Sequence, residues 1–363
     1  MTVIRRLWLE NFRNYPSLEL SLKSGRILFT GANGQGKSNL LEAVCYLGTA
    51  TSFRGAPPEA LIMAGQDQAV IRAEVTSASR DILVEMDLVR GKRSRIQVNK
   101  QRVSRTSDLV GQVPNTVFGP DDLELVKGGP ANRRRFLDDL LAQLHPKHAA
   151  ARSDVERILK QRNALLRSSG GRLTADVEST LAVWNDKLAV AGTQLGEARR
   201  ELVVKLSPVV DEIYSSLAGA GHRVELTYDP VWLAEGLAAS LQSVVSDELR
   251  RGTTLVGPHR DELDVELSGL PARTQASQGE QRTLALALKV AGHRELGDAL
   301  NTSPLLLLDD VFSELDPERA TSLLALLVAD QTMITSASPS PPVAGALQHL
   351  LVVDGVVRAS GAD

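Results

Sequence analysis

Residues 31–38, which read Gly-Ala-Asn-Gly-Gln-Gly-Lys-Ser, constrain this chain more than any other segment. They match the pattern GxxxxGK[ST], with a β-rich segment at 26–30 before them and an apolar helical segment at 38–47 after them. Glycines at this spacing let the backbone fold tightly, so that its N–H groups can face phosphate oxygens beside a positive helix end. This order of elements favours a phosphate loop over a glycine-rich turn that only caps a helix.

The loop predicts a nucleotide site with distinct roles for its last two residues. Lys37 supplies a point charge for the β- and γ-phosphates, and Ser38 supplies a hydroxyl ligand for Mg²⁺. The residues expected to bind the nucleotide are Gly31, Ala32, Asn33, Gly34, Gln35, Gly36, Lys37 and Ser38.

A second acidic site follows the leucine run at 305–308. A uniformly apolar strand is typical of a parallel sheet that is buried on both faces, and ligands bind at the carboxyl ends of such strands. Asp309 is therefore expected to hold Mg²⁺ through water, and Asp310 to orient or deprotonate the attacking water as a catalytic residue with Lys37. A polar loop after a buried strand is the alternative, which the phosphate loop disfavours.

The turn Ser277-Gln278-Gly279-Glu280 opens an apolar helix and has two interpretations. Ser-x-x-Glu is a capping box, which satisfies helix N–H groups without any ligand. Ser277, Gly279 and the helix N-terminus could also grip the γ-phosphate of a nucleotide held by a second subunit. Both interpretations can hold together.

Length and patterning predict an α/β protein with a helical insertion. The 363 residues suggest two domains, and strands expected at 69–75, 82–89 and 95–98 form an antiparallel meander beside the nucleotide strand. The segment from about 130 to 250 is helical. Within it, heptad-spaced leucines predict a long helix that stops at Ser207-Pro208. Ser207 would cap the next helix, with Pro208 in its first turn. Strand character returns at Leu255-Val256 and at 263–267.

These patterns divide the chain into three parts. The expected boundaries are 1–125 and 253–363 for the two parts of the ATPase lobe, and 126–252 for the helical lobe. A single cysteine excludes a disulfide framework and suits a reducing cytosol, and no apolar run is long enough to span a membrane. We therefore expect a cytoplasmic protein.

The net charge of −3 does not indicate a nucleic-acid partner, so any such interaction depends on local charge. Between residues 90 and 105 there are seven basic residues and no acidic one: Arg90, Lys92, Arg93, Arg95, Lys100, Arg102 and Arg105. This cluster could follow a DNA backbone, or it could be solvated turn charge. The arginine triplet at 133–135 also has two possible roles. It could bind phosphate, or it could pair with Asp138 and Asp139 within the helix.

Several motifs in order resemble the ATP-binding cassette family, and within it the RecF family of bacterial recombination mediators. The phosphate loop, the SQGE turn and the LLLLDD strand resemble the cassette signatures, and 271 residues separate Ser38 from Asp309, as in the branch with an inserted helical lobe. The RecF-like blocks are NFRNY at 11–15, DLELVKG at 122–128, RRRFLD at 133–138, GPHRD at 257–261 and SQGEQR at 277–282. The resemblance covers residues 3 to 337.

The resemblance implies an ATPase head that binds ATP and Mg²⁺ and dimerises head to tail on ATP. It implies single- or double-stranded DNA at gaps as a partner, and recombinase loading with mediator proteins such as RecR. No clear glutamine stands at the Q-loop position, for which Gln112 is only the nearest candidate, and the strand at 333–336 ends without the switch histidine of transporters. Together with Asp at 310, these departures imply slow hydrolysis, which DNA would stimulate.

Two other classes of protein fit this sequence less well. A transporter ATPase subunit is disfavoured by the long insertion and the missing switch histidine. A GTPase is disfavoured because Asn99-Lys100 is followed by Gln-Arg, without the Asp that guanine recognition needs.

Overall fold

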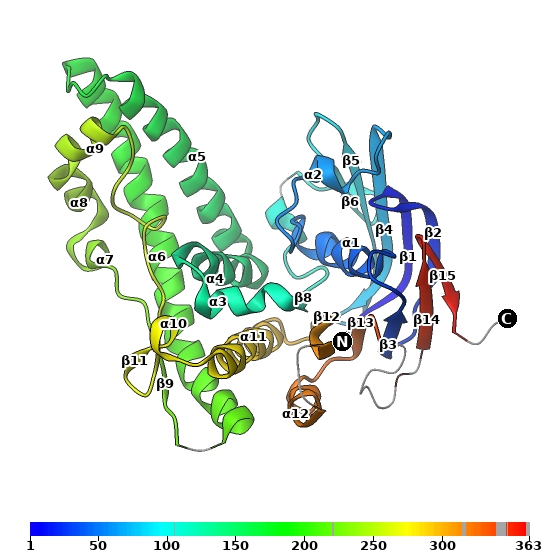
Figure 1. Cartoon of the computed structure of the whole chain (residues 1–363). Coiled ribbons are helices and arrows are strands. Elements are labelled where there is room, and N and C mark those ends of the chain that lie inside the picture. The colour runs from blue at the N-terminus through cyan, green and yellow to red at the C-terminus, as the bar shows by residue number, and fades with distance from the viewer. Residues whose placement is uncertain (105, 220, 314–316, 339–345, 347, 361–363) are drawn as a thin grey trace. The chain divides into compact units, whose positions relative to one another are not determined.

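The computed structural model describes residues 1–104, 106–219, 221–313, 317–338, 346 and 348–360. The chain forms two compact units, one of residues 1–122 and 286–363 and one of residues 123–285 (Figure 1). The first carries the phosphate loop, and the second is mostly helical.

The first unit contains a six-stranded sheet that is antiparallel throughout. Its order is β2-β1-β4-β5-β6-β7, formed by β1 (Thr2–Phe12), β2 (Tyr15–Ser21), β4 (Gln68–Ser77), β5 (Arg80–Val89), β6 (Arg95–Val98) and β7 (Gln101–Arg102). Buried and exposed residues alternate along β2 and β4, as a sheet with one covered face requires. The expected meander is therefore present, but it pairs with β1 and not with the nucleotide strand.

The second sheet of this unit carries the phosphate loop. Its order is β15-β14-β3-β13-β12-β8, and the strands from β14 to β8 are parallel. They are β3 (Gly25–Thr30), β8 (Asn115–Phe118), β12 (Leu305–Asp309), β13 (Gln331–Ser336) and β14 (Gln348–Val353), and β15 (Val356–Ala359) pairs antiparallel with β14. Every residue of β12 is buried, as its leucine run predicts.

Helix α1 (Lys37–Thr49) connects the two sheets through one apolar core. Ten of its thirteen residues are buried, and Leu40, Leu41 and Val44 belong to a cluster that also contains side chains of β1, β4, β12 and β13. The short helices of this unit are α2 (Pro58–Leu61), α12 (Pro317–Leu326) and three 3₁₀ turns at Thr106–Leu109, Pro120–Leu123 and Val311–Ser313. The core fixes the start of α1, and with it the phosphate loop.

The second unit is built on two long antiparallel helices, α5 (Pro146–Ser168) and α6 (Ala175–Ala218), which lie side by side (Figure 1). The other helices are α3 (Glu124–Lys127), α4 (Pro130–Leu144), α7 (Val231–Glu235), α8 (Leu237–Ser243), α9 (Val245–Arg251) and α10 (Ala272–Gln275). A small sheet of β9 (Val224–Thr227), β10 (Asp264–Leu267) and β11 (Leu270–Pro271) completes it. Helix α11 (Gln278–Leu300) begins in this unit and ends in the first.

Two local predictions for this unit are wrong. Helix α6 continues through Pro208 instead of stopping there, and Ser207 Oγ accepts a hydrogen bond from Leu226 N of β9 at 3.0 Å instead of capping a helix. Packing of α6 on β9 outweighs the loss of one helical N–H. Residues 255–256 form no strand, since Leu255 N donates to the Glu248 carboxylate at 2.9 Å.

The second domain boundary differs from the expected one. Strands β10 and β11 lie after residue 252, yet they belong with β9 to the helical unit. That unit therefore extends to residue 285 and includes the turn at Ser277. No helix among the described residues is both long and apolar enough to cross a bilayer.

Candidate nucleotide-binding site

The phosphate loop leaves β3 and enters α1 with backbone angles that only glycine adopts easily. Gly31 has φ 151°, and a Cβ on it would lie 2.3 Å from the carbonyl oxygen of Val352. Gly36, the N-cap of α1, has φ 110°, and a Cβ there would lie 2.6 Å from the Asn14 side chain. Both positions therefore exclude any side chain, which keeps the loop tight.

The outer side of the loop is held by segments from both ends of the chain. Tyr15 OH donates to the Gly36 carbonyl at 3.0 Å, and Asn14 Nδ2 donates to the Gln35 carbonyl at 3.0 Å. The Gly355 N–H, in the turn between β14 and β15, donates to the same Gln35 carbonyl at 3.2 Å. Burial also raises the pKa of Tyr15, so this phenol stays a neutral donor.

Lys37 lies at the start of α1 with its side chain inside the loop. Its ammonium donates to the carbonyls of Gly31 and Ala32 at 2.7 and 2.8 Å, and the residue is buried. Burial lowers the pKa of Lys37, while Asp310 and Asp309 act in the opposite direction. The loop thus encloses one positive charge, as phosphate binding requires, and the charges of Asp309 and Asp310 act on it.

Ser38 and Asp309 lie 271 residues apart in the chain and meet in the structure. Ser38 Oγ donates to Asp309 Oδ1 at 2.7 Å, and Asp309 is buried at the end of β12. One hydroxyl and one carboxylate are hard oxygen donors, which suit Mg²⁺ held by few protein ligands together with substrate phosphates. These two residues therefore fit the expected metal position.

Asp310 follows Asp309 in a left-handed backbone conformation, with φ 52°. Its N–H donates to Thr335 Oγ1 at 3.0 Å, and the residue is partly exposed. Aspartate tolerates this conformation better than most residues do. The turn it makes ends the strand abruptly, directly after the buried Asp309.

The turn at Ser277 lies in the other unit and forms the capping box. Ser277 N and Oγ both donate to Glu280 Oε2 at 2.7 Å, and Glu280 N donates back to Ser277 Oγ at 3.4 Å. Hydrogen bonds from Ser277 lower the pKa of Glu280. Ser277, Gln278 and Gly279 are exposed, and a Cβ on Gly279 would meet nothing within 4 Å. The helix start is therefore capped and still open to solvent.

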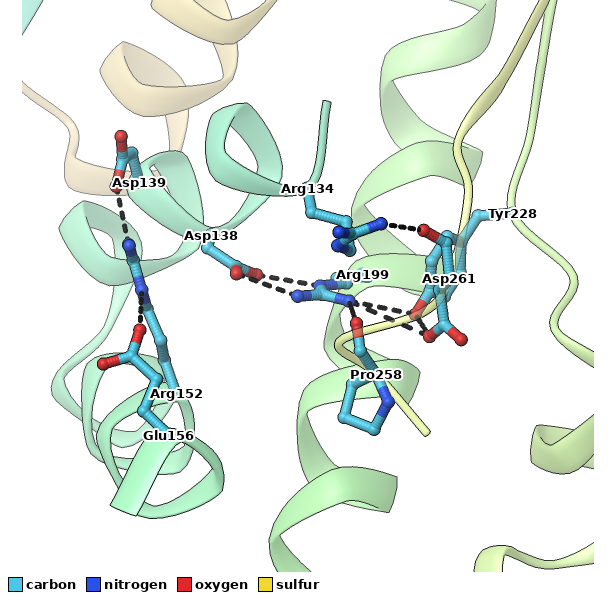
Figure 2. A network of polar contacts seen from close by, with 9 residues as sticks. All are labelled: Arg134, Asp138, Asp139, Arg152, Glu156, Arg199, Tyr228, Pro258 and Asp261. Atoms are coloured by element: carbon cyan, nitrogen blue, oxygen red, sulfur yellow. Dashed lines mark hydrogen bonds and ion pairs between the residues drawn. The ribbon is translucent and has the colours of Figure 1, made fainter. Parts of the chain in front are cut away.

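A buried polar network in the helical unit includes both RRRFLD and GPHRD (Figure 2). The Arg199 guanidinium of α6 donates to both carboxylate oxygens of Asp138 at 2.8 Å and to the Pro258 carbonyl at 2.7 Å. Asp261 accepts hydrogen bonds from Trp232 Nε1, at 2.7 Å, and from Tyr228 OH. The network fixes the loop at 257–261 against α4 and α6.

The arginine triplet contributes to the same structure. Arg133 is buried, forms a bidentate ion pair with Glu262 at 2.7 and 2.9 Å, and donates to the carbonyls that end α3. Arg134 donates to the Asp261 carbonyl at 2.6 Å (Figure 2), and Arg135 pairs with Asp139 at 3.4 Å. These partners favour a structural role for the triplet over phosphate binding, although only Arg135 pairs within its own helix.

The basic cluster lies on the exposed edge of the antiparallel sheet. Six of its members are exposed, and none pairs with a carboxylate within the described part of the chain: Arg90, Lys92, Arg93, Arg95, Lys100 and Arg102. Strands β6 and β7 are joined by Asn99-Lys100, both with positive φ, as in a type I′ hairpin. The side chain of Arg105, the seventh member, lies outside the described residues.

Three residues around the loop carry no role in the sequence-based prediction. Asn14 and Tyr15 lie within the NFRNY block, and Thr335 is the last but one residue of β13. Only the folded chain brings the first two to the loop and the third to Asp309. Nothing in their local pattern signals these contacts. His259 also has a defined environment in the helical unit, where its Nε2 lies 3.1 Å from the Thr254 carbonyl.

Comparison with known proteins agrees with this architecture. Residues 3–340 match the family model described as the RecF/RecN/SMC N-terminal domain. The chain is 41% identical over 378 residues to the DNA replication and repair protein RecF of Frankia alni, covering 98% of this chain and 100% of that one. It is 42% identical over 359 residues to RecF of Streptomyces avermitilis, covering 95% of each.

Solved structures give the same result. A structure of the recombination mediator protein RecF with ATP, in the RecFOR pathway, superimposes with a TM-score of 0.92 at 28% identity, covering 99% of this chain and 98% of that one. An Smc head bound to a domain of ScpA matches with a TM-score of 0.57 at 17% identity, over 98% and 97% of the two chains, which shows a shared fold alone. The chain therefore belongs to the RecF family of DNA replication and repair proteins, with the fold of an ATP-binding cassette ATPase head that contains an inserted helical unit.

Proposed function

We propose that this protein is an ATP-dependent DNA-binding protein of recombinational repair and replication-fork maintenance. The observation that carries the proposal is the contact between Ser38 and Asp309, which joins the phosphate loop to the acidic strand. ATP would be bound by residues 31–38, with Lys37 facing the β- and γ-phosphates. Ser38 and Asp309 would hold Mg²⁺, which neutralises phosphate charge when bound.

The second part of the proposal is a head-to-tail homodimer formed on ATP. The start of α11 is exposed, positive at its end and free of side-chain bulk at Gly279, so it suits the γ-phosphate bound by a partner subunit. Ser277 caps the helix in the monomer and would turn to the phosphate in the dimer. Hydrolysis would be slow and stimulated by DNA, with Asp310 orienting the attacking water.

DNA is proposed to bind the basic edge of the antiparallel sheet. Its six exposed cations lack acidic partners among the described residues, so they are available to phosphates, which supply most sequence-independent affinity. The dimer would clamp single- or double-stranded DNA at gaps and release it after hydrolysis. Mediator proteins such as RecR would then promote recombinase loading, in the cytoplasm.

ATP turnover, measured with and without gapped DNA at several protein concentrations, tests this function. Activity per subunit should rise with protein concentration, because a composite site needs two subunits, and DNA should increase it further. Turnover per subunit that is independent of concentration contradicts the dimer. Equal turnover with and without DNA contradicts the coupling to DNA.

A further inference from the structure

Strand β13 ends beside the acidic end of β12. The two strands are parallel neighbours, and Asp309 and Thr335 are paired in register. Thr335 is 1% exposed, so its hydroxyl must find partners inside the protein. In transporter ATPases a histidine is expected near this strand end, and here the chain reads Thr335-Ser336.

The Thr335 hydroxyl contacts both acidic residues at once. Oγ1 donates to Asp309 Oδ1 at 2.7 Å and accepts from the Asp310 N–H at 3.0 Å. The Leu308 carbonyl, at 3.5 Å, is a more distant acceptor. A hydroxyl has a single proton, so the short contact to Asp309 uses it while a lone pair receives Asp310.

Asp309 is therefore oriented by two hydroxyls. Ser38 Oγ and Thr335 Oγ1 both donate to Oδ1 at 2.7 Å, and Oδ2 accepts no hydrogen bond from the described residues. The carboxylate is thus held at Oδ1 by both hydroxyls, and Oδ2 is available to an ion or its water. Ser38 is itself expected to bind the metal. Thr335 is then the hydroxyl that keeps its hydrogen bond to Asp309 when Mg²⁺ is bound.

We propose that Thr335 is a positioning residue for the nucleotide site: it orients the Asp309 carboxylate toward Mg²⁺ and holds the left-handed turn at Asp310. This inference rests on the proposed function. Removing the hydroxyl frees Asp309 to rotate and leaves the Asp310 N–H without its acceptor. Outer partners of metal ligands typically contribute about 10–100-fold in metal affinity or activity.

The test compares three variants in isothermal titration of ATP over a range of Mg²⁺ concentrations. Thr335→Val keeps the shape and removes the hydroxyl, and Thr335→Ser keeps the hydroxyl. Thr332→Val is the matched control, because Thr332 is buried in the same strand but lies on its other face. Thermal unfolding without nucleotide separates loss of fold from loss of the site, and Thr335→Ala replaces the valine variant if that one does not fold.

The Mg²⁺ concentration needed for half of the tight ATP binding should rise about 10–100-fold in Thr335→Val. It should stay near the wild-type value in Thr335→Ser and Thr332→Val. Folded Thr335→Val or Thr335→Ala protein with the wild-type Mg²⁺ dependence would overturn the inference. If the wild-type protein itself binds ATP equally with and without Mg²⁺, the proposed function fails instead.

Discussion

Replacing Arg199 with methionine is expected to destabilise the helical unit by about 3–5 kcal/mol, because the change leaves a buried carboxylate without its cation. The side chains of Arg199 and Asp138 are 3% and 11% exposed, and two hydrogen bonds of 2.8 Å join them. The guanidinium also donates to the Pro258 carbonyl at 2.7 Å. Methionine fills much of the volume but replaces none of these bonds, so the cost is electrostatic.

Arg152→Met is the matched control from the same part of the molecule (Figure 2). Arg152 pairs with Asp139 at 2.6 Å and with Glu156 at 3.1 Å, but these three side chains are 28%, 39% and 67% exposed. Ion pairs that solvent reaches contribute at most about 1 kcal/mol. The two variants therefore remove the same charge from one unit and should differ severalfold in free energy.

Urea denaturation of both variants, followed by circular dichroism and by hydrogen exchange in α6 and β10, measures the difference. With a slope of about 1–3 kcal/mol/M, Arg199→Met should lower the midpoint for the helical unit by more than about 1 M, and Arg152→Met by far less. Calorimetry should show unchanged ATP affinity, because the hydrogen bonds that Arg199→Met removes all lie in the helical unit. Equal midpoints for the two variants would refute the argument that burial sets the cost.

Three further predictions concern the site, the basic edge and acid stability. Lys37→Met should weaken ATP binding by about 10–100-fold with an unchanged circular dichroism spectrum, since a charged hydrogen-bond donor is removed, and retained affinity in calorimetry would count against the phosphate loop. The second variant neutralises four cations of the basic cluster: Arg90, Lys92, Arg93 and Arg95. It should weaken DNA binding about equally for all sequences and flatten the salt dependence by about one unit of slope for each phosphate that is no longer neutralised. An unchanged slope would indicate solvated turn charge. Burial lowers the pKa of His259 to about 4. The contribution of the neutral imidazole to stability is therefore present above pH 6.5 and is lost as the pH falls toward 4, by up to about 3 kcal/mol. His259→Gln should reduce this acid sensitivity in pH-dependent urea melts, and an equally acid-sensitive variant would rule the histidine out as its source.

Local sequence patterns predict much of this structure. The phosphate loop, the buried strand β12 and the capping box at Ser277 each arise from residues close together in the chain, so spacing alone indicates them. The resemblance to known motifs adds their order. The chemistry of the candidate site is therefore readable before the fold is known.

Long-range packing decides what local patterns cannot. Pro208 is a helix breaker in isolation, yet α6 passes through it because the helix packs on β9. Strands β10 and β11 join the helical unit through pairing with β9, although they follow the segment expected to close it. Thr335 reaches Asp309 only because β12 and β13 lie in register. The residues of one segment alone cannot predict these long-range contacts.

In the proposed dimer ATP joins two copies of this chain through Ser277, and light scattering with and without ATP and Mg²⁺ tests this arrangement most directly. The wild-type mass should double on ATP. Ser277→Arg should remain folded, since losing the cap costs about 1 kcal/mol, and should still bind ATP yet stay monomeric. Ser179→Arg, which adds the same charge at an exposed position of α6, should dimerise like the wild type. A Ser277→Arg protein that still doubles its mass on ATP would contradict the composite site.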